Sequence, residues 1–259
     1  GITSSDYINT VSESYAEEIL TPEFGGPFYE VLQARSGRLS GILIGINYSN
    51  FPRNFDEHNI TEIKTKNKEK LQQKLGLKVD KNTPLFSFIG RIDPGQKGLD
   101  ILYTVVEGII DNGGQFVLLG TGDMGWEQKF KDLANKRNLK KGFSCNIMFD
   151  AELANKIYSA SDFLLIPSKY EPCGLIQMIG MWYATIPVAN NVGGLKDTIE
   201  HDKSGILFNS YSTEAFTNAI LQAFELYNNQ DDFTGMQKRI IRKDFSWNKS
   251  AQKYTDLYK

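Results

Sequence analysis

The sequence predicts an α/β protein with a Rossmann-like parallel sheet that carries helices on both faces. The first observation is that short continuous apolar runs recur along the chain, and strands buried on both faces have this composition. The second is that segments of helical periodicity, ~10 to 15 residues long, separate these runs, which favours parallel pairing. The chain has 259 residues, of which 41% are hydrophobic, so it can bury one large core.

The apolar runs are the predicted strands of the sheet. In chain order they are Leu85 to Ile89, Gln115 to Leu119, Cys145 to Phe149, Phe163 to Ile166, Ile186 to Ala189 and Ile206 to Phe208. The helix after the first strand has its apolar residues on one face, namely Leu102, Val105, Val106, Ile109 and Ile110. Later helices are predicted at Glu152 to Ala160, along a stripe from Ala215 to Tyr227, at Phe233 to Lys243 and at Ser246 to Tyr258.

The charge balance argues against a nucleic-acid partner. Lysine and arginine number 29 and aspartate and glutamate 31, so the formal charge is only -2 and no positive field surrounds the protein. The lysine-rich segment from Lys64 to Lys74 overlaps a helix predicted at Lys66 to Leu75, which has one apolar pair at helical spacing. We therefore expect a surface helix whose lysines are solvated.

Cysteine content and hydropathy bound the environment of the protein. The two cysteines are Cys145, in a predicted strand, and Cys173, in a loop, which is a poor disulfide framework and suits a reducing compartment. The sequence has no signal peptide and no apolar run near ~20 residues, so we expect neither secretion nor a membrane span.

The stretch from Asp162 to Thr198 is the one most suited to bind a ligand. It reads as strand, polar elbow, helix, strand, glycine pair and short helix. Loops at the carboxyl ends of parallel strands form the ligand-binding edge of such sheets. Each loop here also leads into a helix, where free backbone N-H groups suit an anion such as phosphate. The glycine pair Gly193-Gly194 would permit close approach of the backbone to that anion, or it could be an ordinary turn.

Three charged residues are candidates for chemistry at this edge. Arg91 and Lys97 follow the first strand, where they could bind a phosphate group or simply be solvated loop cations. Glu171 lies in the elbow and could equally be a residue that the helix dipole favours. Cys173 precedes a helix, but no partner base is near it in sequence, and the only histidines, His58 and His201, lie in polar loops.

A glycine-rich segment offers a competing interpretation. Gly120-Thr121-Gly122-Asp123-Met124-Gly125 matches GxGxxG after a strand and before a helix, which by itself suggests an NAD-dependent oxidoreductase. The match lies in the second strand-helix unit, and Trp126 closely follows its third glycine. This alternative stays open as a remote one.

Several motifs together resemble those of bacterial glycogen synthases and plant starch synthases, which are retaining GT-B glucosyltransferases. The chain contains EPCGLIQ from Glu171, then GGL from Gly193 and the pair Asp197-Thr198. The similarity also covers NTVSESYAEEI, TPEFGG, FIGRI..GQKGLD, VLLGTGD and DFSW. Many retaining transferases of this fold have a second glutamate eight positions after the first, where this chain has Ile179. The pattern of Cys173 and Gln177 instead points to the synthase branch.

The resemblance implies a reaction and a set of site residues. The sheet would be the C-terminal half of a GT-B fold, and the protein would transfer glucose from ADP-glucose or UDP-glucose to the non-reducing end of an α-1,4-glucan with retention. Arg91 and Lys97 would bind the donor diphosphate, Glu171 would contact the glucose, and Phe149 would stack on the base. The other implied donor-site residues are Gly120, Thr121, Cys173, Gly174, Leu175, Gly193 and Gly194. No metal or other cofactor is implied, and no nucleic-acid or membrane partner.

The resemblance also implies an organisation of the chain. Residues 1–40 would be the tail of an N-terminal acceptor domain, residues 41–245 the nucleotide-sugar domain and residues 246–259 a crossover helix. We expect such a chain to bind nucleotide but to elongate glucan only together with an upstream domain. The protein would be cytoplasmic, or in the plastid stroma if it comes from a plant or alga.

Two departures keep a second interpretation open. Ile44 and Asn47 stand where the resembling family usually has asparagine and aspartate, so a polar contact near the cleft is lost at Ile44. The alternative to an enzyme is a non-catalytic glucan-binding or scaffold module on the same fold.

Overall fold

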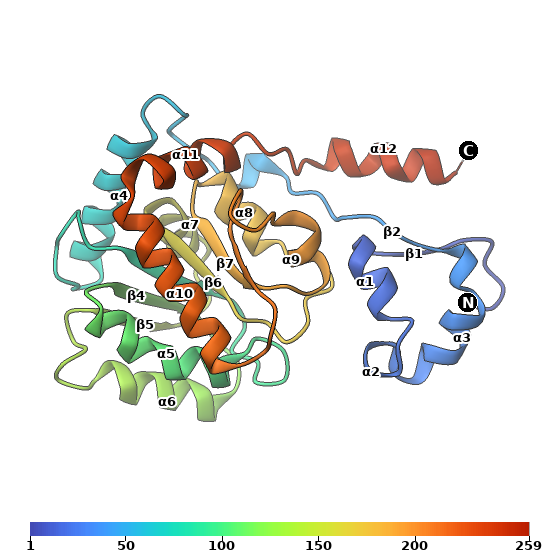
Figure 1. Ribbon diagram of the computed structural model, residues 1–259, viewed down its shortest axis with the longest axis horizontal. Coiled ribbons are helices and arrows are strands. Elements are labelled where there is room, and N and C mark those ends of the chain that lie inside the picture. The colour runs from blue at the N-terminus through green and yellow to red at the C-terminus, as the bar shows by residue number, and fades with distance from the viewer. Residues whose placement is uncertain (259) are drawn as a thin grey trace.

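The computed structural model describes residues 1–258 and shows a six-stranded parallel sheet at its centre (Figure 1). The strands lie in the order β5-β4-β3-β6-β7-β8, so the chain starts in the middle of the sheet and builds outward in both directions. Their carboxyl ends therefore all meet at one edge. The strands are β3 (Leu85–Ile89), β4 (Gln115–Gly120), β5 (Phe143–Ile147), β6 (Phe163–Ile166), β7 (Ile186–Asn190) and β8 (Ile206–Phe208).

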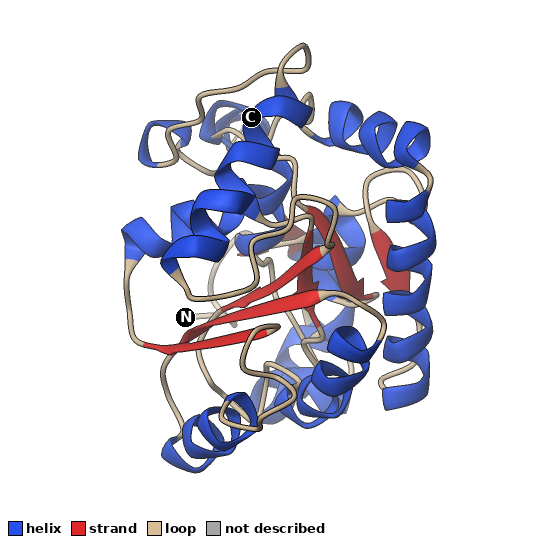
Figure 2. Cartoon of the chain, turned by 90° about the vertical axis from the view of Figure 1, so that its left-hand side faces the viewer, coloured by secondary structure: helices blue, strands red, loops and turns tan. Residues whose placement is uncertain are grey.

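Helices cover both faces of this sheet, as predicted (Figures 1 and 2). On one face α5 (Leu99–Asp111) packs against α10 (Thr213–Asn228), and α6 (Met124–Ala134) lies beside α5 through the ring contact of Trp126 with Tyr103. On the other face α7 (Ala151–Ala160) packs between α4 (Ile60–Lys74) and α8 (Ile176–Trp182). The remaining helices of this part are α9 (Gly193–Thr198) and α11 (Gln230–Ile240).

The predicted strands correspond to observed ones, with one shift that matters for the site. The strand expected at Cys145 to Phe149 is β5, which runs from Phe143 to Ile147. Phe143 pairs with Phe116 of β4, so the ladder starts earlier and Phe149 lies in the loop beyond the strand. Because β5 is an edge strand and most of it is only half-buried, its apolar pattern was too weak to set its boundaries.

The first residues form a small unit beside the main sheet (Figure 1). Strands β1 (Ile8–Thr10) and β2 (Leu39–Gly41) pair in parallel, and α1 (Glu13–Glu18), α2 (Pro22–Gly25) and α3 (Tyr29–Ala34) connect them with short 3₁₀ turns. We call residues 1–41 the N-terminal unit. Among the described residues, no helix of this unit or of the rest is long and apolar enough to cross a membrane.

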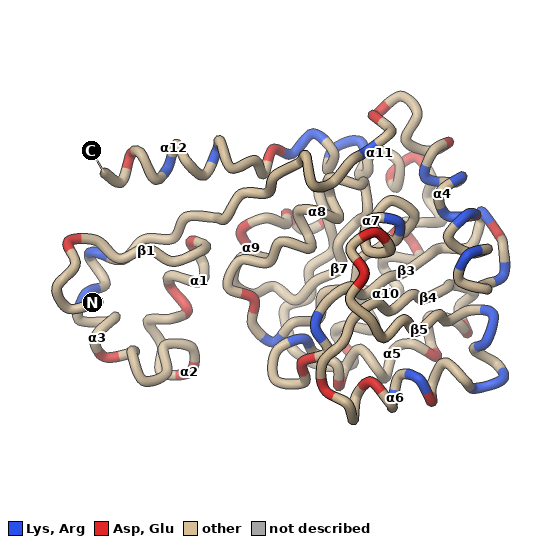
Figure 3. The backbone as a smooth tube through the Cα atoms, turned by 180° about the vertical axis from the view of Figure 1, so that it is seen from behind, with Lys and Arg blue, Asp and Glu red and all other residues tan. Residues whose placement is uncertain are grey.

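The last helix, α12 (Trp247–Leu257), runs away from the main sheet toward the N-terminal unit (Figure 3). Lys253 pairs with Glu13 at 2.7 Å, and the Tyr254 hydroxyl donates to Asn9 at 3.0 Å. One segment connects the N-terminal unit to the main sheet, and another connects the main sheet to α12. A hydrogen bond joins these two segments, because the Ile46 N-H donates to the Phe245 carbonyl at 2.7 Å. The domain boundaries at residues 40 and 245 stay a prediction.

Helix α4 contradicts the sequence prediction. It begins at Ile60, six residues before the predicted start at Lys66, and two of its lysines, Lys64 and Lys68, are buried against the sheet. The prediction that the lysines from Lys64 to Lys74 are a solvated face is therefore wrong for these two. A run of lysines in the sequence shows which residues are charged. It does not reveal that buried oxygen atoms accept hydrogen bonds from two of them.

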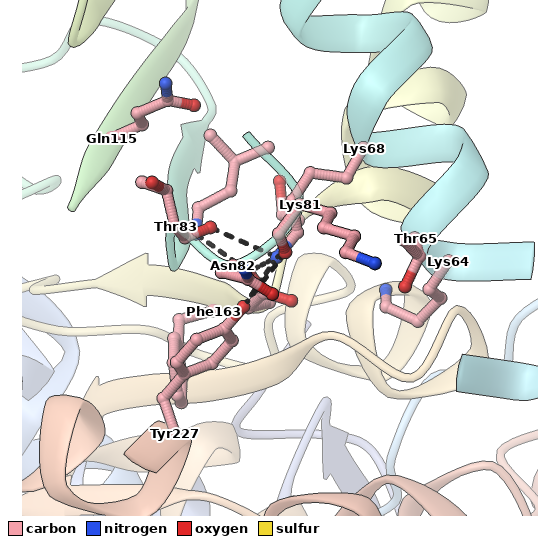
Figure 4. Close-up of polar contacts among 12 residues, drawn as sticks. Lys64, Thr65, Lys68, Lys81, Asn82, Thr83, Gln115, Phe163 and Tyr227 are labelled. Atoms are coloured by element: carbon pink, nitrogen blue, oxygen red, sulfur yellow. Dashed lines mark hydrogen bonds and ion pairs between the residues drawn. The ribbon is translucent and has the colours of Figure 1, made fainter. Parts of the chain in front are cut away.

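The acceptors are main-chain and side-chain oxygens at the amino ends of the strands (Figure 4). The Lys68 Nζ lies 2.5 Å from Asp162 Oδ2 and donates to the Tyr227 hydroxyl at 3.0 Å and the Thr83 carbonyl at 3.1 Å. The same Asp162 oxygen accepts the Leu85 N-H at 2.8 Å, so one carboxylate joins α4, β3 and the start of β6. We call Lys68 and Asp162 the buried ion pair.

Lys64 is buried one turn earlier on α4 and has no carboxylate in contact. Its Nζ donates to the Tyr183 carbonyl at 2.9 Å and to the Thr185 hydroxyl at 3.0 Å. Burial lowers the pKa of Lys64 to about 7, because an ammonium ion loses its hydration there. Neutral Lys64 can still donate to these oxygens, so the helix stays attached when the charge is lost.

Candidate active site

A cavity of about 460 Å³ opens at the carboxyl ends of β3, β4 and β5. Four residues predicted for the donor site line it, namely Arg91, Gly120, Thr121 and Phe149. Gly120 is required there, because a Cβ on it would lie 2.0 Å from the Gly90 carbonyl oxygen. The rest of the wall is largely apolar and includes Ile89, Leu119, Met148, Ala154, Tyr158 and Ile179. Such a wall suits a flat ring system.

Phe149 stands at the mouth of this cavity with its side chain in solvent. It is 90% exposed, and the neighbouring Met148 is 46% exposed. An exposed ring beside an apolar cavity is a stacking surface that a bound aromatic base could cover.

Replacing Phe149 with alanine is expected to weaken nucleotide binding about tenfold, because a stacked base contributes ~1 to 3 kcal/mol. Inorganic pyrophosphate has no base, so its affinity should stay nearly unchanged. Calorimetric titration of both ligands checks this. Equal weakening of the two would mean that Phe149 does not contact the base.

Arg91 extends from the end of β3 with 70% of its side chain exposed. Its Nη2 donates to the Gln96 Oε1 at 2.8 Å, and its Nη1 lies 3.4 Å from Asp93 Oδ2. Gln96 is buried and its Nε2 donates to the Tyr170 carbonyl at 3.3 Å. Gln96, which the sequence did not single out, thus orients the guanidinium toward the elbow and leaves it free to contact a ligand.

Lys97 and Glu171, 74 residues apart, meet in the structure. The Lys97 Nζ lies 2.6 Å from Glu171 Oε2, and the two side chains are 13% and 8% exposed. Ser168, also missed from sequence, donates its hydroxyl to the same oxygen at 3.0 Å. The cation and the carboxylate that the resemblance assigns to different parts of one donor are therefore held side by side, and their contact with a ligand stays a prediction.

Hydrogen bonds to its own main chain fix the elbow between β6 and α8. Gly174 has a positive φ of 70°, and the Gln177 side chain donates to the Cys173 carbonyl at 3.0 Å and the Gly174 carbonyl at 2.8 Å. Leu175 follows as the N-cap of α8 and is partly exposed. These contacts fix the shape of the loop that carries Glu171.

Cys173 is buried in this elbow. Burial raises the pKa of its thiol, and the Ile44 N-H donates to its sulfur. A buried protonated thiol is a poor nucleophile. The structure therefore gives Cys173 a packing position beside the site, in keeping with a lining role.

The glycine pair has partners within the protein. The Gly193 N-H donates to Glu18 Oε1 at 2.7 Å, and the Gly194 N-H donates to the Glu171 carbonyl at 2.9 Å. Both glycines allow α9 to pack on the elbow, since a Cβ on Gly194 would lie 2.0 Å from the Cys173 carbonyl oxygen. Their contact with a diphosphate stays a prediction, and Glu18 is a neighbour that the sequence did not reveal.

Polar groups of the GxGxxG segment also have hydrogen-bond partners within the protein. The Thr121 hydroxyl and the Gly122 N-H both donate to Glu127 Oε1, at 2.7 and 2.8 Å. A carboxylate of the same chain thus lies where a dinucleotide phosphate would have to bind. Elsewhere in residues 1–258, no group of three or more histidines, cysteines, aspartates or glutamates is placed to hold a metal ion.

Comparison with known protein families decides between the two interpretations. The model of the family described as glycosyl transferases group 1 matches residues 67–239, which include the elbow and most of the cavity lining. The chain belongs to this family. A second model, described as starch synthase catalytic domain, matches residues 1–34. Membership of the glycosyl transferases rules against the NAD-dependent oxidoreductase.

Individual members of the glycosyl transferases give a finer comparison. The chain is 41% identical over 267 residues to a glycogen synthase of Thermodesulfovibrio yellowstonii and 43% identical over 271 residues to one of Petrotoga mobilis. The alignments cover 100% of this chain but 53% and 56% of those relatives. The catalytic domain of starch synthase IV from Arabidopsis thaliana, solved with ADP and acarbose, matches with a TM-score of 0.91 and 31% identity. That match covers 99% of this chain and 56% of the other, so this chain spans about half the length of its relatives.

Proposed function

We propose that the protein acts in glycogen or starch synthesis, as the donor-binding part of a retaining glucosyltransferase. The reaction transfers glucose from ADP-glucose or UDP-glucose to the non-reducing end of an α-1,4-glucan. The observation that carries the proposal is that the base cavity, the exposed Arg91 and the Lys97–Glu171 pair follow one another along a single edge of the sheet. A nucleotide sugar presents its base, diphosphate and sugar in that order.

The geometry accounts for how the donor would be activated. Departure of a nucleoside diphosphate places negative charge on the leaving oxygen, and fixed cations there stabilise the transition state more than the ground state. Arg91 and Lys97 supply that charge. Glu171 is held beside Lys97. In this proposal it would lie near the glucosyl carbon and stabilise the positive charge that develops as the bond to the diphosphate breaks.

The relatives support the identity of the substrates without separating the nucleotides. The glycogen synthases and the starch synthase share at least 31% of aligned residues with this chain, and the starch synthase was solved with ADP. An adenine donor is therefore our first choice, with UDP-glucose as the alternative. Acarbose in that structure favours an α-glucan as the acceptor.

One observation favours a second candidate, a glucan-binding or scaffold module without activity. Ile44 lies beside Cys173, where the resembling enzymes usually have a polar side chain, and it can offer no hydrogen bond to a sugar. If this module were the true function, the chain would bind maltooligosaccharide but show no affinity for ADP-glucose. Titration with both ligands separates the candidates.

The decisive experiment is calorimetric titration of ADP into the wild-type chain and into an Arg91→Ala variant. We expect ADP to bind without added divalent metal, since the cations of the site neutralise its diphosphate. Arg91→Ala is expected to lose ~1.5 to 3 kcal/mol of binding free energy, as for a hydrogen bond to a charged group. Arg137→Ala, which removes an exposed arginine that does not line the cavity, is the control and should bind normally. Unchanged binding in Arg91→Ala would refute the assignment.

A further inference from the structure

Glu18 of the N-terminal unit contacts the residues that support the elbow. Its Oε1 accepts the Gly193 N-H at 2.7 Å. The next residue, Gly194, donates its N-H to the Glu171 carbonyl at 2.9 Å. These two bonds lie in series, so a single residue of main chain separates the Glu18 carboxylate from the main chain of Glu171.

The packing between Gly193 and Glu171 leaves no space for independent movement. A Cβ on Gly193 would lie 2.1 Å from the Glu171 carbonyl oxygen, and Gly193 has a positive φ of 43°. Only glycine fits such an approach without strain. A shift of Gly193 is therefore passed directly to the main chain that carries the Glu171 carboxylate.

Two serines of the N-terminal unit also hydrogen-bond to the elbow and to α9. The Ser12 hydroxyl donates to the Pro172 carbonyl at 2.5 Å, immediately after Glu171. The Ser14 N-H and hydroxyl donate to the two oxygens of Asp197, at 2.9 and 2.5 Å. The elbow and α9 are thus held from the side of the N-terminal unit at three points.

The environment of Glu18 shows that its carboxylate is placed for a protein contact. Its Oε2 is buried and has no hydrogen-bond partner among the described residues. Burial raises the pKa of Glu18, and the bond from Gly193 opposes this rise. A half-buried carboxylate costs free energy unless a donor compensates it, and here the Gly193 N-H is that donor.

We propose that Glu18 is a positioning residue for Glu171, acting through Gly193 and Gly194. It fixes the main chain from which the Glu171 carboxylate reaches the transferred glucosyl group. The inference rests on the proposed function, since it takes Glu171 to be the residue beside that group. Glu18 does not line the cavity proposed for the base, and it already engages the Gly193 N-H, so within this inference ADP is held by Arg91, Lys97 and the cavity. Loss of Glu18 leaves those groups in place and weakens recognition of the glucose.

The test compares ADP with ADP-glucose by calorimetry, well below the melting temperature of each variant. In the wild-type chain we expect the glucosyl group to tighten binding relative to ADP, and equal affinities would overturn the inference. In Glu18→Ala we expect that gain to fall about tenfold while the affinity for ADP changes less than about twofold, because a lost hydrogen bond to a charged group has this size. Glu18→Gln keeps an oxygen for the Gly193 N-H and should stay within about threefold of wild type. Glu17→Ala removes the exposed neighbour on α1 and is the control.

The contrary outcomes distinguish failure of this inference from failure of the proposed function. A Glu18→Ala variant that keeps the wild-type ratio of the two affinities overturns the inference. Equal weakening of ADP and ADP-glucose also overturns it, as does a glutamine variant as weak as the alanine one. A wild-type chain that binds neither ligand instead refutes the proposed function, before any variant is considered.

Discussion

Glu171→Gln is expected to tighten ADP binding about tenfold. In the free protein the Lys97 Nζ is neutralised by Glu171 at 2.6 Å, and both side chains are nearly buried. A diphosphate must therefore share this cation with a carboxylate that also repels it. Glutamine removes the repulsion, and a change of ~1.4 kcal/mol for one nearby charge corresponds to a tenfold gain.

The same substitution should nearly abolish transfer. In an assay supplied with an upstream acceptor domain, as the proposed function requires, we expect glucosyl transfer to fall ~10²- to 10³-fold, the size found when a group that stabilises transition-state charge is removed. Titration with ADP and an assay with labelled ADP-glucose measure the two effects. Glu225→Gln, at an exposed site on α10, is the matched control. Weaker ADP binding in Glu171→Gln would contradict the role given to the Lys97–Glu171 pair.

Asp162→Asn is expected to lower the free energy of unfolding by ~3 to 5 kcal/mol, because it leaves the Lys68 charge buried without its partner. The two side chains of the buried ion pair are only 4% and 5% exposed. Asparagine keeps an oxygen for the Leu85 N-H, so the loss reports the charge pair. Urea unfolding with comparison of m-values measures it.

The same helix supplies a control for burial. Lys66 and Glu62 of α4 are also 2.5 Å apart, but they are 56% and 65% exposed. Glu62→Gln should therefore cost far less stability than Asp162→Asn, because solvent screens the exposed pair. ADP affinity of folded Asp162→Asn should be normal, since the pair lies at the amino ends of the strands. A loss as small as that of Glu62→Gln would mean that water reaches Lys68.

The order of strands and helices could be predicted from sequence because continuous apolar runs and helical stripes arise from burial itself. Leu85 to Ile89 is buried throughout, and its boundaries were predicted as the structure shows them. The weakest boundary was that of β5, where an edge position leaves most of the strand half-buried. The apolar pattern was thus clearest in strands that are buried on both faces of the sheet.

Side-chain partners could not be predicted in the same way. The burial of Lys64 and Lys68 depends on oxygens that come from segments up to 159 residues away, and one sequence does not show which segments meet. Glu18 looked like any glutamate on an amphipathic helix. Arg91, Phe149 and Glu171 could be singled out only through the resemblance to a known family, and the structure adds that Gln96 and Ser168 hydrogen-bond to Arg91 and Glu171.

Strand β3 joins a structural anchor to the wall of the cavity within one short segment. At its amino end the Leu85 N-H is bound by Asp162, and at its carboxyl end Ile89 and Gly90 line the base cavity. Substitutions at the cavity end can change which nucleotide is accepted while the anchor at the other end keeps the strand in register. Because the anchor and the cavity lining share no residue, we expect the wall of the cavity to tolerate substitution without loss of the strand's register.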